Sequence, residues 1–148
     1  NYILVFQYVS DIETIQEAYK IAKESNLDLY IFSSSPYARR YGKVILNIGV
    51  EEFLGYIRNA ELIITDSFHC SAFSIIFDKE FYSKFRKGDP ANTRLENLLE
   101  LFDINDRNMT LENTIKKKTI NYDYVNKKLS ILRGRSLDYL NSILEELL

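Results

Sequence analysis

Short apolar runs without polar alternation are the feature of this 148-residue sequence that most limits its fold. Residues 2–8, 27–32 and 62–65 consist almost entirely of apolar, β-branched or aromatic side chains. A strand that is apolar on both faces must be covered on both faces, as in a parallel sheet. These runs therefore predict buried parallel strands, and the less uniformly apolar runs at 44–48 and 80–85 predict two more.

Amphipathic segments separate the apolar runs. Ser10 to Glu13 fits a capping box at the start of a helix, in which the serine oxygen and the glutamate carboxylate bind free backbone N–H groups. We expect this helix to end at Asn26. Helices are also expected at residues 51–59 and 92–102, each with an apolar stripe at helical spacing.

The segment 69–77 is so apolar that it predicts a deeply buried helix. Residues 103–121 are polar and predicted to be irregular, and 122–148 predict one long amphipathic helix. Strands that alternate with helices indicate βαβ units with right-handed crossovers. We therefore expect residues 1–148 to form a single Rossmann-like α/β domain, with helices on both faces of a parallel sheet.

The composition of the chain argues against several classes of function. The net charge of -2 argues against a broad electrostatic surface for nucleic acid. The single cysteine excludes an intrachain disulfide and favours a reducing compartment. No apolar run approaches the ~20 residues of a membrane span. We expect a cytoplasmic location, and attachment to the inner face of the membrane stays open. The chain starts directly on a strand without methionine, so we expect that an upstream segment is missing.

The sequence contains no motif for binding a metal ion or a dinucleotide. One histidine and one cysteine cannot form a structural zinc site, and we expect no metal. No glycine-rich dinucleotide fingerprint and no phosphate-binding lysine loop is present.

The strand-to-helix turn at residues 65–69 is the best candidate for a ligand site. Ligands of parallel sheets bind beyond the carboxyl ends of the strands. The hydroxyls of Thr65 and Ser67 could donate to phosphate or carboxylate oxygens, and a helix start favours an anion. His69, the only histidine, is of the residue type whose unperturbed pKa, about 6.5, suits proton transfer.

Structural explanations for these residues stay open. Asp66 or Ser67 could simply cap the helix that follows, and a lone histidine is more often structural than catalytic. Cys70 is interpreted as a small packing residue. Arg94 lies in the first turn of its helix, where a cation opposes the helix dipole. This position points to an anionic ligand, although a solvated arginine is the alternative.

The order and spacing of several segments resemble the C-terminal half of the polysaccharide pyruvyl transferase family. The resemblance covers most of residues 44–148, and Thr-Asp-Ser-Phe-His at 65–69 is its most specific element. Cys70 departs from the pattern, because the family usually has glycine there. The other segments that carry the resemblance are 51–54, 57–60, 72–74, 93–95, 98–99, 122–125 and 135–140.

The resemblance implies one half of a two-domain fold similar to B-type glycosyltransferases. Family members transfer pyruvate from phosphoenolpyruvate to two hydroxyls of a sugar, forming a ketal and releasing phosphate. By resemblance, His69 is the acid/base residue and Arg94 binds the donor anion. Thr65, Asp66, Ser67 and Phe68 are then donor-binding residues.

The partners implied are phosphoenolpyruvate as donor substrate, with no separate cofactor, and a glycan or lipid-linked sugar as acceptor. An N-terminal domain is also implied, so the chain alone is expected to bind donor without turnover. Two alternatives stay open. The chain could belong to a glycosyltransferase that uses a nucleotide sugar, or it could be a non-catalytic binding domain.

Overall fold

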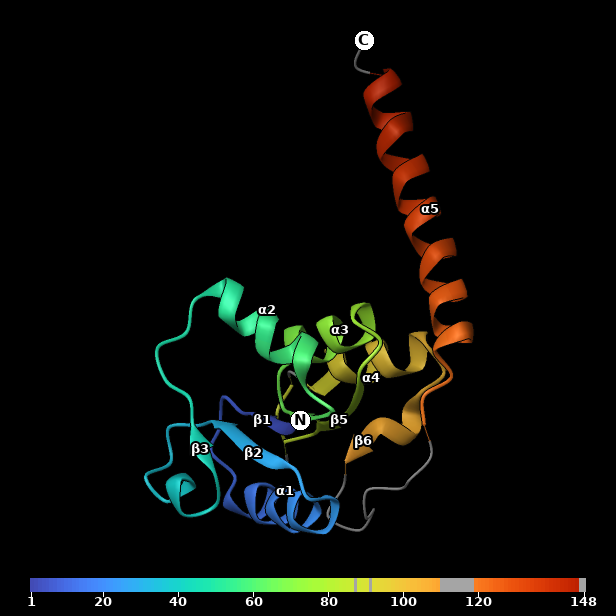
Figure 1. The fold of residues 1–148 in the computed structure, drawn as a ribbon. Coiled ribbons are helices and arrows are strands. Elements are labelled where there is room, and N and C mark those ends of the chain that lie inside the picture. The colour runs from blue at the N-terminus through green and yellow to red at the C-terminus, as the bar shows by residue number, and fades with distance from the viewer. Residues whose placement is uncertain (87, 91, 110–118, 147–148) are drawn as a thin grey trace. The chain divides into compact units, whose positions relative to one another are not determined.

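The computed structural model describes residues 1–86, 88–90, 92–109 and 119–146. The chain divides into two compact units, Asn1–Lys118 and Thr119–Leu148. The first unit contains a sheet with its helices, and the second contains one long helix (Figure 1).

The first unit is built on one parallel sheet. Its strands have the order β3-β2-β1-β4-β5-β6, and all five neighbouring pairs are parallel. This is the Rossmann strand order, so the predicted α/β class is confirmed. The strands are β1 (Tyr2–Phe6), β2 (Asp28–Phe32), β3 (Lys43–Val44), β4 (Leu62–Thr65), β5 (Glu80–Lys84) and β6 (Asn108–Met109).

Helices cover both faces of the sheet, as the sequence predicts. Helix α1 lies on one face, whereas α2 and α3 lie on the other (Figure 1). Alternation along β1 fits this arrangement, because Ile3 and Val5 share a core cluster with Ile15 of α1. The helices of this unit are α1 (Ile12–Ser25), α2 (Val50–Asn59), α3 (Phe68–Ile76) and α4 (Asn92–Leu101), with 3-10 turns at Ala38–Arg40 and Asn105–Arg107.

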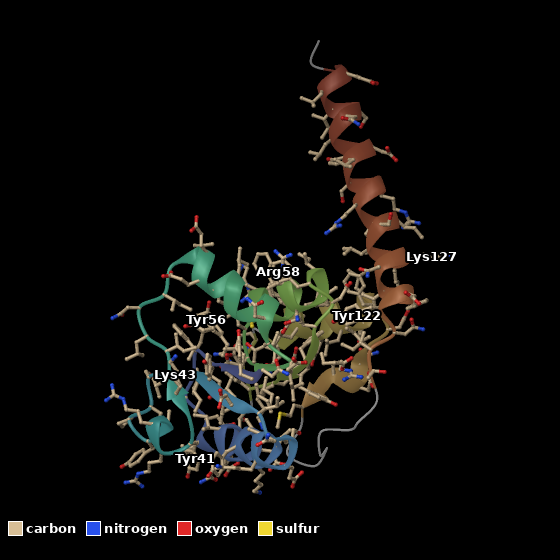
Figure 2. The ribbon with its side chains drawn as sticks, in the orientation of Figure 1. Tyr41, Lys43, Tyr56, Arg58, Tyr122 and Lys127 are labelled. Atoms are coloured by element: carbon tan, nitrogen blue, oxygen red, sulfur yellow. The ribbon has the colours of Figure 1, made fainter. Side chains whose placement is uncertain are left out.

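An aromatic cluster fixes α2 above the start of β1. The Tyr2 ring stacks on Tyr30 with centroids 4.4 Å apart, and its hydroxyl donates to the Tyr56 carbonyl at 2.8 Å. Tyr56 projects from α2 (Figure 2). Burial, with the neighbouring tyrosines, raises the pKa of Tyr2 to about 12.

The start of α1 differs from the prediction. The helix is capped by Asp11, whose carboxylate accepts from the Glu13 N–H at 3.1 Å and the Thr14 hydroxyl at 2.6 Å. The predicted capping box from Ser10 is therefore wrong. The carboxylate provides two acceptor oxygens where a serine provides one, which favours Asp11 as the cap. The predicted stop at Asn26 is confirmed, because this residue adopts the left-handed conformation with φ 54.

Several strand limits also differ. The strand predicted over residues 2–8 ends at Phe6, and the one predicted over 44–48 is only Lys43–Val44. The short strand β6 falls within residues 103–121, which were predicted to be irregular. Of that segment, residues 110–118 lie outside the described residues.

Helix α3 is buried on one face only. Cys70, Ser71, Ser74 and Ile75 are buried, whereas Ile76 is 43% exposed. The prediction of deep burial is therefore correct for the inner face alone. On that face the hydroxyls of Ser71 and Ser74 form hydrogen bonds inside the protein.

The second unit is the helix α5 (Tyr122–Glu146). It confirms the long helix predicted from residue 122, while residues 147–148 lie outside the described part. Large apolar side chains such as Ile131, Leu137 and Leu140 are exposed along it. Among the described residues, no helix is both long and apolar enough to cross a membrane.

Candidate functional site

The direction of strand order reverses between β1 and β4. Phe6 at the end of β1 pairs in register with Thr65 at the end of β4. From here α1 continues to one face of the sheet and α3 to the other (Figure 1). Such a reversal leaves a crevice at the carboxyl ends of the strands, where ligands of this fold class bind. The turn at 65–69 lies at this edge, as predicted.

Asp66 joins the two central strands. It is 3% exposed, and its carboxylate accepts from the Tyr8 N–H at 2.8 Å and the Val9 N–H at 3.1 Å. The Arg86 Nε lies 3.6 Å from the same carboxylate. The charge of Asp66 is thus already matched by donors of the protein, and its contacts are those of a residue that shapes the crevice.

Thr65 and Ser67 bind within the turn itself. The Thr65 hydroxyl oxygen accepts from the Ser67 N–H at 3.0 Å, and the Ser67 hydroxyl oxygen accepts from the Cys70 N–H at 3.3 Å. Both residues are buried. The capping role considered for Ser67 is therefore the one that the structure shows, and both hydroxyls stabilise the start of α3.

Cys70 packs inside the protein, as interpreted from the sequence. Its thiol is fully buried, and burial raises its pKa to about 12. The Cys70 side chain therefore lies on the core side of α3.

His69 and Arg94 lie against the same aromatic ring. The imidazole and Phe68 rings meet edge to face with centroids 5.6 Å apart, and the Arg94 guanidinium carbon lies 5.8 Å from the Phe68 centroid. Both His69 and Arg94 are exposed, and neither side chain has a hydrogen bond or ion pair with the described residues. Phe68 thus brings together two polar groups that come from different helices.

The helix start beside these side chains offers further donors. The Cys70 N–H is capped by Ser67, but the N–H groups of Phe68 and His69 have no acceptor in the described part of the chain. Such N–H groups carry the positive end of the helix dipole. The exposed cluster of His69, Phe68, Arg94 and these two N–H groups can therefore receive an anion.

A clamp holds α4, and with it Arg94, against the end of β5. The side-chain oxygen of Asn92 accepts from the Arg86 N–H at 2.9 Å, and its amide nitrogen donates to the Arg86 carbonyl. Asn92 is the first residue of α4, two positions before Arg94. The clamp fixes the end of the helix that carries the exposed guanidinium.

A cavity of about 700 Å³ lies over the carboxyl ends of β1, β4, β5 and β6. Of its lining residues the sequence identified only Asp66 as a site candidate, because the others are far apart in the sequence and share no motif. The only available signal was their position just after or at the ends of predicted strands. The cavity is lined by Gln7, Val9, Asp11, Glu13, Asp66, Lys84, Phe85, Arg86, Gly88, Asp89, Asn92 and Met109. Within the described residues, no group of three or more His, Cys, Asp or Glu side chains could hold a metal ion.

Comparison with known proteins assigns the family. Residues 1–83 match the model of the polysaccharide pyruvyl transferase family. The chain belongs to this family. The family predicted from the sequence is thus confirmed, but the resemblance was placed on residues 44–148, whereas the match lies in the N-terminal part of the chain. The turn at 65–69 falls within the match and Arg94 falls outside it, so the family match gives no support for a role of Arg94. No curated protein matches the sequence.

Two solved structures are similar to parts of this chain. Heptosyltransferase WaaC of E. coli, solved with ADP, is 13% identical with a TM-score of 0.44, and the match covers 67% of this chain and 43% of that one. The UDP-GlcNAc 2-epimerase of Methanocaldococcus jannaschii, solved with UDP-GlcNAc and UDP, is 17% identical with a TM-score of 0.46. That match covers 90% of this chain and 45% of the epimerase. The pyruvyl transferase family chain thus spans less than half the length of either protein.

Proposed function

We propose that this chain is the donor-binding domain of an enzyme that transfers pyruvate from phosphoenolpyruvate to two hydroxyls of a sugar. The observation that carries the proposal is the contact of His69 and Arg94 with one Phe68 ring at the ligand-binding edge of the sheet. Membership of the pyruvyl transferase family supports the class of reaction.

Arg94 would bind an anionic group of the donor. Its guanidinium is exposed and forms no ion pair with the described carboxylates. A guanidinium matches the two oxygens of a carboxylate or phosphate with two parallel donors. The N–H groups of Phe68 and His69 would add donors to the second anionic group. Phosphoenolpyruvate carries both a carboxylate and a phosphate, so it suits such a cluster.

His69 would transfer the proton that starts the reaction. An imidazolium gives its proton to the methylene carbon of the donor, which becomes a methyl group and leaves positive charge at the adjacent carbon. A sugar hydroxyl attacks that carbon and gives its proton to the imidazole. A second hydroxyl then replaces the phosphate, which leaves with the electrons of its C–O bond and takes up the proton of that hydroxyl. The products are the cyclic ketal and inorganic phosphate, and the exposure of His69 allows this approach.

The remaining parts of the proposal concern the whole enzyme. A second domain would help to shape the site of the glycan or lipid-linked acceptor in a B-type arrangement, so that this chain alone binds donor without turnover. The reaction needs no cofactor or metal by this mechanism. The enzyme would act in the cytoplasm, where the single cysteine stays reduced.

Calorimetric titration tests the donor. Phosphoenolpyruvate should bind the wild-type chain, and Arg94→Ala should weaken it about tenfold, the loss of one charge-assisted contact. Arg58→Ala is the matched control, since Arg58 is another exposed arginine and lies on α2 (Figure 2). UDP-glucose should not bind. Binding of the nucleotide sugar with no response to phosphoenolpyruvate would favour the glycosyltransferase alternative, and binding of neither would favour a non-catalytic domain.

A further inference from the structure

Gln7 carries a buried donor that the protein does not use. The residue follows β1 directly at the reversal of strand order and is only 2% exposed. Its Nε2 is buried without a hydrogen-bond partner in the described structure. Buried amide groups are nearly always hydrogen-bonded, so an unpaired one in a residue that lines a cavity indicates a missing acceptor.

The orientation of this amide follows from its neighbour. The Gln7 Oε1 accepts from the Asp11 N–H at 3.3 Å. Rotating the amide by half a turn would place the NH₂ group against that N–H, which is also a donor. The Nε2 is therefore the atom that needs an external partner.

The charges around the cavity indicate what the partner is. Lys84 lies 3.8 Å from the Asp11 carboxylate, and Arg86 pairs with Asp89 at 2.9 Å and with Asp66 at 3.6 Å. Among the described lining residues, four carboxylates outnumber these two cations. The cavity therefore differs from the cluster around Arg94, and its charge disfavours an anion.

We propose that this cavity is a saccharide subsite in which the Gln7 Nε2 donates to a hydroxyl oxygen of the sugar. A sugar hydroxyl both donates and accepts, and this suits a wall that mixes an amide donor with carboxylate oxygens, which are acceptors. Phe85 and Met109 supply an apolar surface for the C–H face of the ring. The proposal that a saccharide binds here is independent of the proposed function. Only the identification of this sugar as the acceptor of the pyruvyl group rests on it.

The two glutamines of the chain provide a direct test. Gln7 and Gln16 are its only glutamines, so each of their side-chain NH₂ pairs can be assigned in a sample labelled with ¹⁵N at glutamine. Gln16 donates to the Tyr41 hydroxyl at 2.9 Å and does not line the cavity, and Tyr41 lies on the β3 side of the sheet (Figure 2). Methyl α-mannoside and methyl β-galactoside at millimolar concentrations should move the Gln7 pair saturably and leave the Gln16 pair in place.

A variant separates the donor from the fold. Gln7→Glu keeps an acceptor for the Asp11 N–H and removes the NH₂ donor, so saccharide affinity should fall about tenfold. Phosphoenolpyruvate affinity should not change, and Gln16→Glu should behave like the wild type toward saccharides. If Gln7→Glu does not fold, the titration of the wild-type glutamine signals decides alone.

Three results would overturn the subsite. Saccharides could leave the Gln7 signals unmoved, glycerol could move them as far as the glycosides do, or inorganic phosphate could move them in place of the glycosides. None of these readings uses phosphoenolpyruvate, so failure of the subsite and failure of the donor assignment are distinguishable.

Discussion

The carboxylate of Asp66 accepts a hydrogen bond at 2.8 Å from the backbone N–H of Tyr8, a residue 58 positions earlier in the chain. Its second oxygen accepts from the Val9 N–H at 3.1 Å. These bonds turn the chain away from the sheet just after β1, and they hold the ends of β1 and β4 together. The wall of the cavity therefore depends on Asp66 even if no ligand touches it.

Asp66→Asn should destabilise the fold. The amide keeps one acceptor oxygen but turns an NH₂ group toward the second backbone N–H, so one charge-assisted bond is lost. The free energy of unfolding should fall by about 1.5 to 3 kcal/mol, measured by urea denaturation. Asp138→Asn, an exposed position on α5, should change it by less than about 0.5 kcal/mol. Equal unfolding midpoints for the two variants would contradict the role of Asp66.

Cys70 should report on opening of the first unit. Its thiol is the only one in the chain and is fully buried. A thiol reagent should therefore leave the native protein unlabelled while it labels the urea-unfolded chain at once. Fast labelling without denaturant would show that the start of α3 opens locally.

The same thiol should make stability fall at alkaline pH. Its pKa is raised from 9.0 to about 12 in the folded state, so above pH 9.0 the unfolded chain loses a proton that the native state keeps. The unfolded state then binds fewer protons, and stability decreases by up to about 1.4 kcal/mol per pH unit. Cys70→Ala should show a shallower decrease in urea titrations at rising pH. Parallel curves for the two proteins would contradict the prediction.

The fold was largely predictable because its strands are buried on both faces. The apolar run at residues 62–65 gave β4 with its observed limits, and the positive-φ residue Asn26 ended α1 as expected. The errors occur where a tertiary contact decides the local structure. Asp66 ends β1 early through Tyr8, and β6 forms only because Asn108 and Met109 find β5 beside them.

The site was predictable only where it lies on continuous sequence. The turn at 65–69 could be located from the strand before it and the helix after it. The hydrogen bonds of Thr65 and Ser67 inside that turn could not be predicted, because the sequence does not show which hydroxyls find local donors. Gln7 and Arg86 meet at one cavity only through the strand order, which the sequence pattern leaves undetermined.

Phe68 should contribute to donor binding through Arg94. The ring holds the guanidinium at 5.8 Å from its centroid, and an exposed cation–π contact contributes about 0.5 to 1 kcal/mol. Phe68→Leu should therefore weaken phosphoenolpyruvate binding about two- to fivefold in calorimetry. Phe73→Leu makes the same change further along α3, where the ring contacts Phe53 and Phe77, and should leave affinity unchanged. A larger loss for the Phe73 variant would indicate a general effect on α3.

His69 and Arg94 should separate into a proton-transfer residue and a binding residue. His69→Asn keeps a polar side chain at an exposed position but removes the imidazole that gives up the proton. Turnover should then fall by about a hundredfold or more, the usual contribution of a positioned acid or base. Phosphoenolpyruvate affinity should change little, because the guanidinium and the helix start remain. For Arg94→Ala we expect the main loss in phosphoenolpyruvate affinity, which should fall about tenfold.

The two effects need two measurements. Calorimetry on the chain gives donor affinity, and phosphate release in the full-length gene product with its acceptor gives turnover. Circular dichroism should show both variants folded, since neither side chain has a hydrogen bond or ion pair within the described residues. Normal turnover in His69→Asn would remove the histidine from the mechanism, because the chain has no other imidazole that could take over the proton transfer.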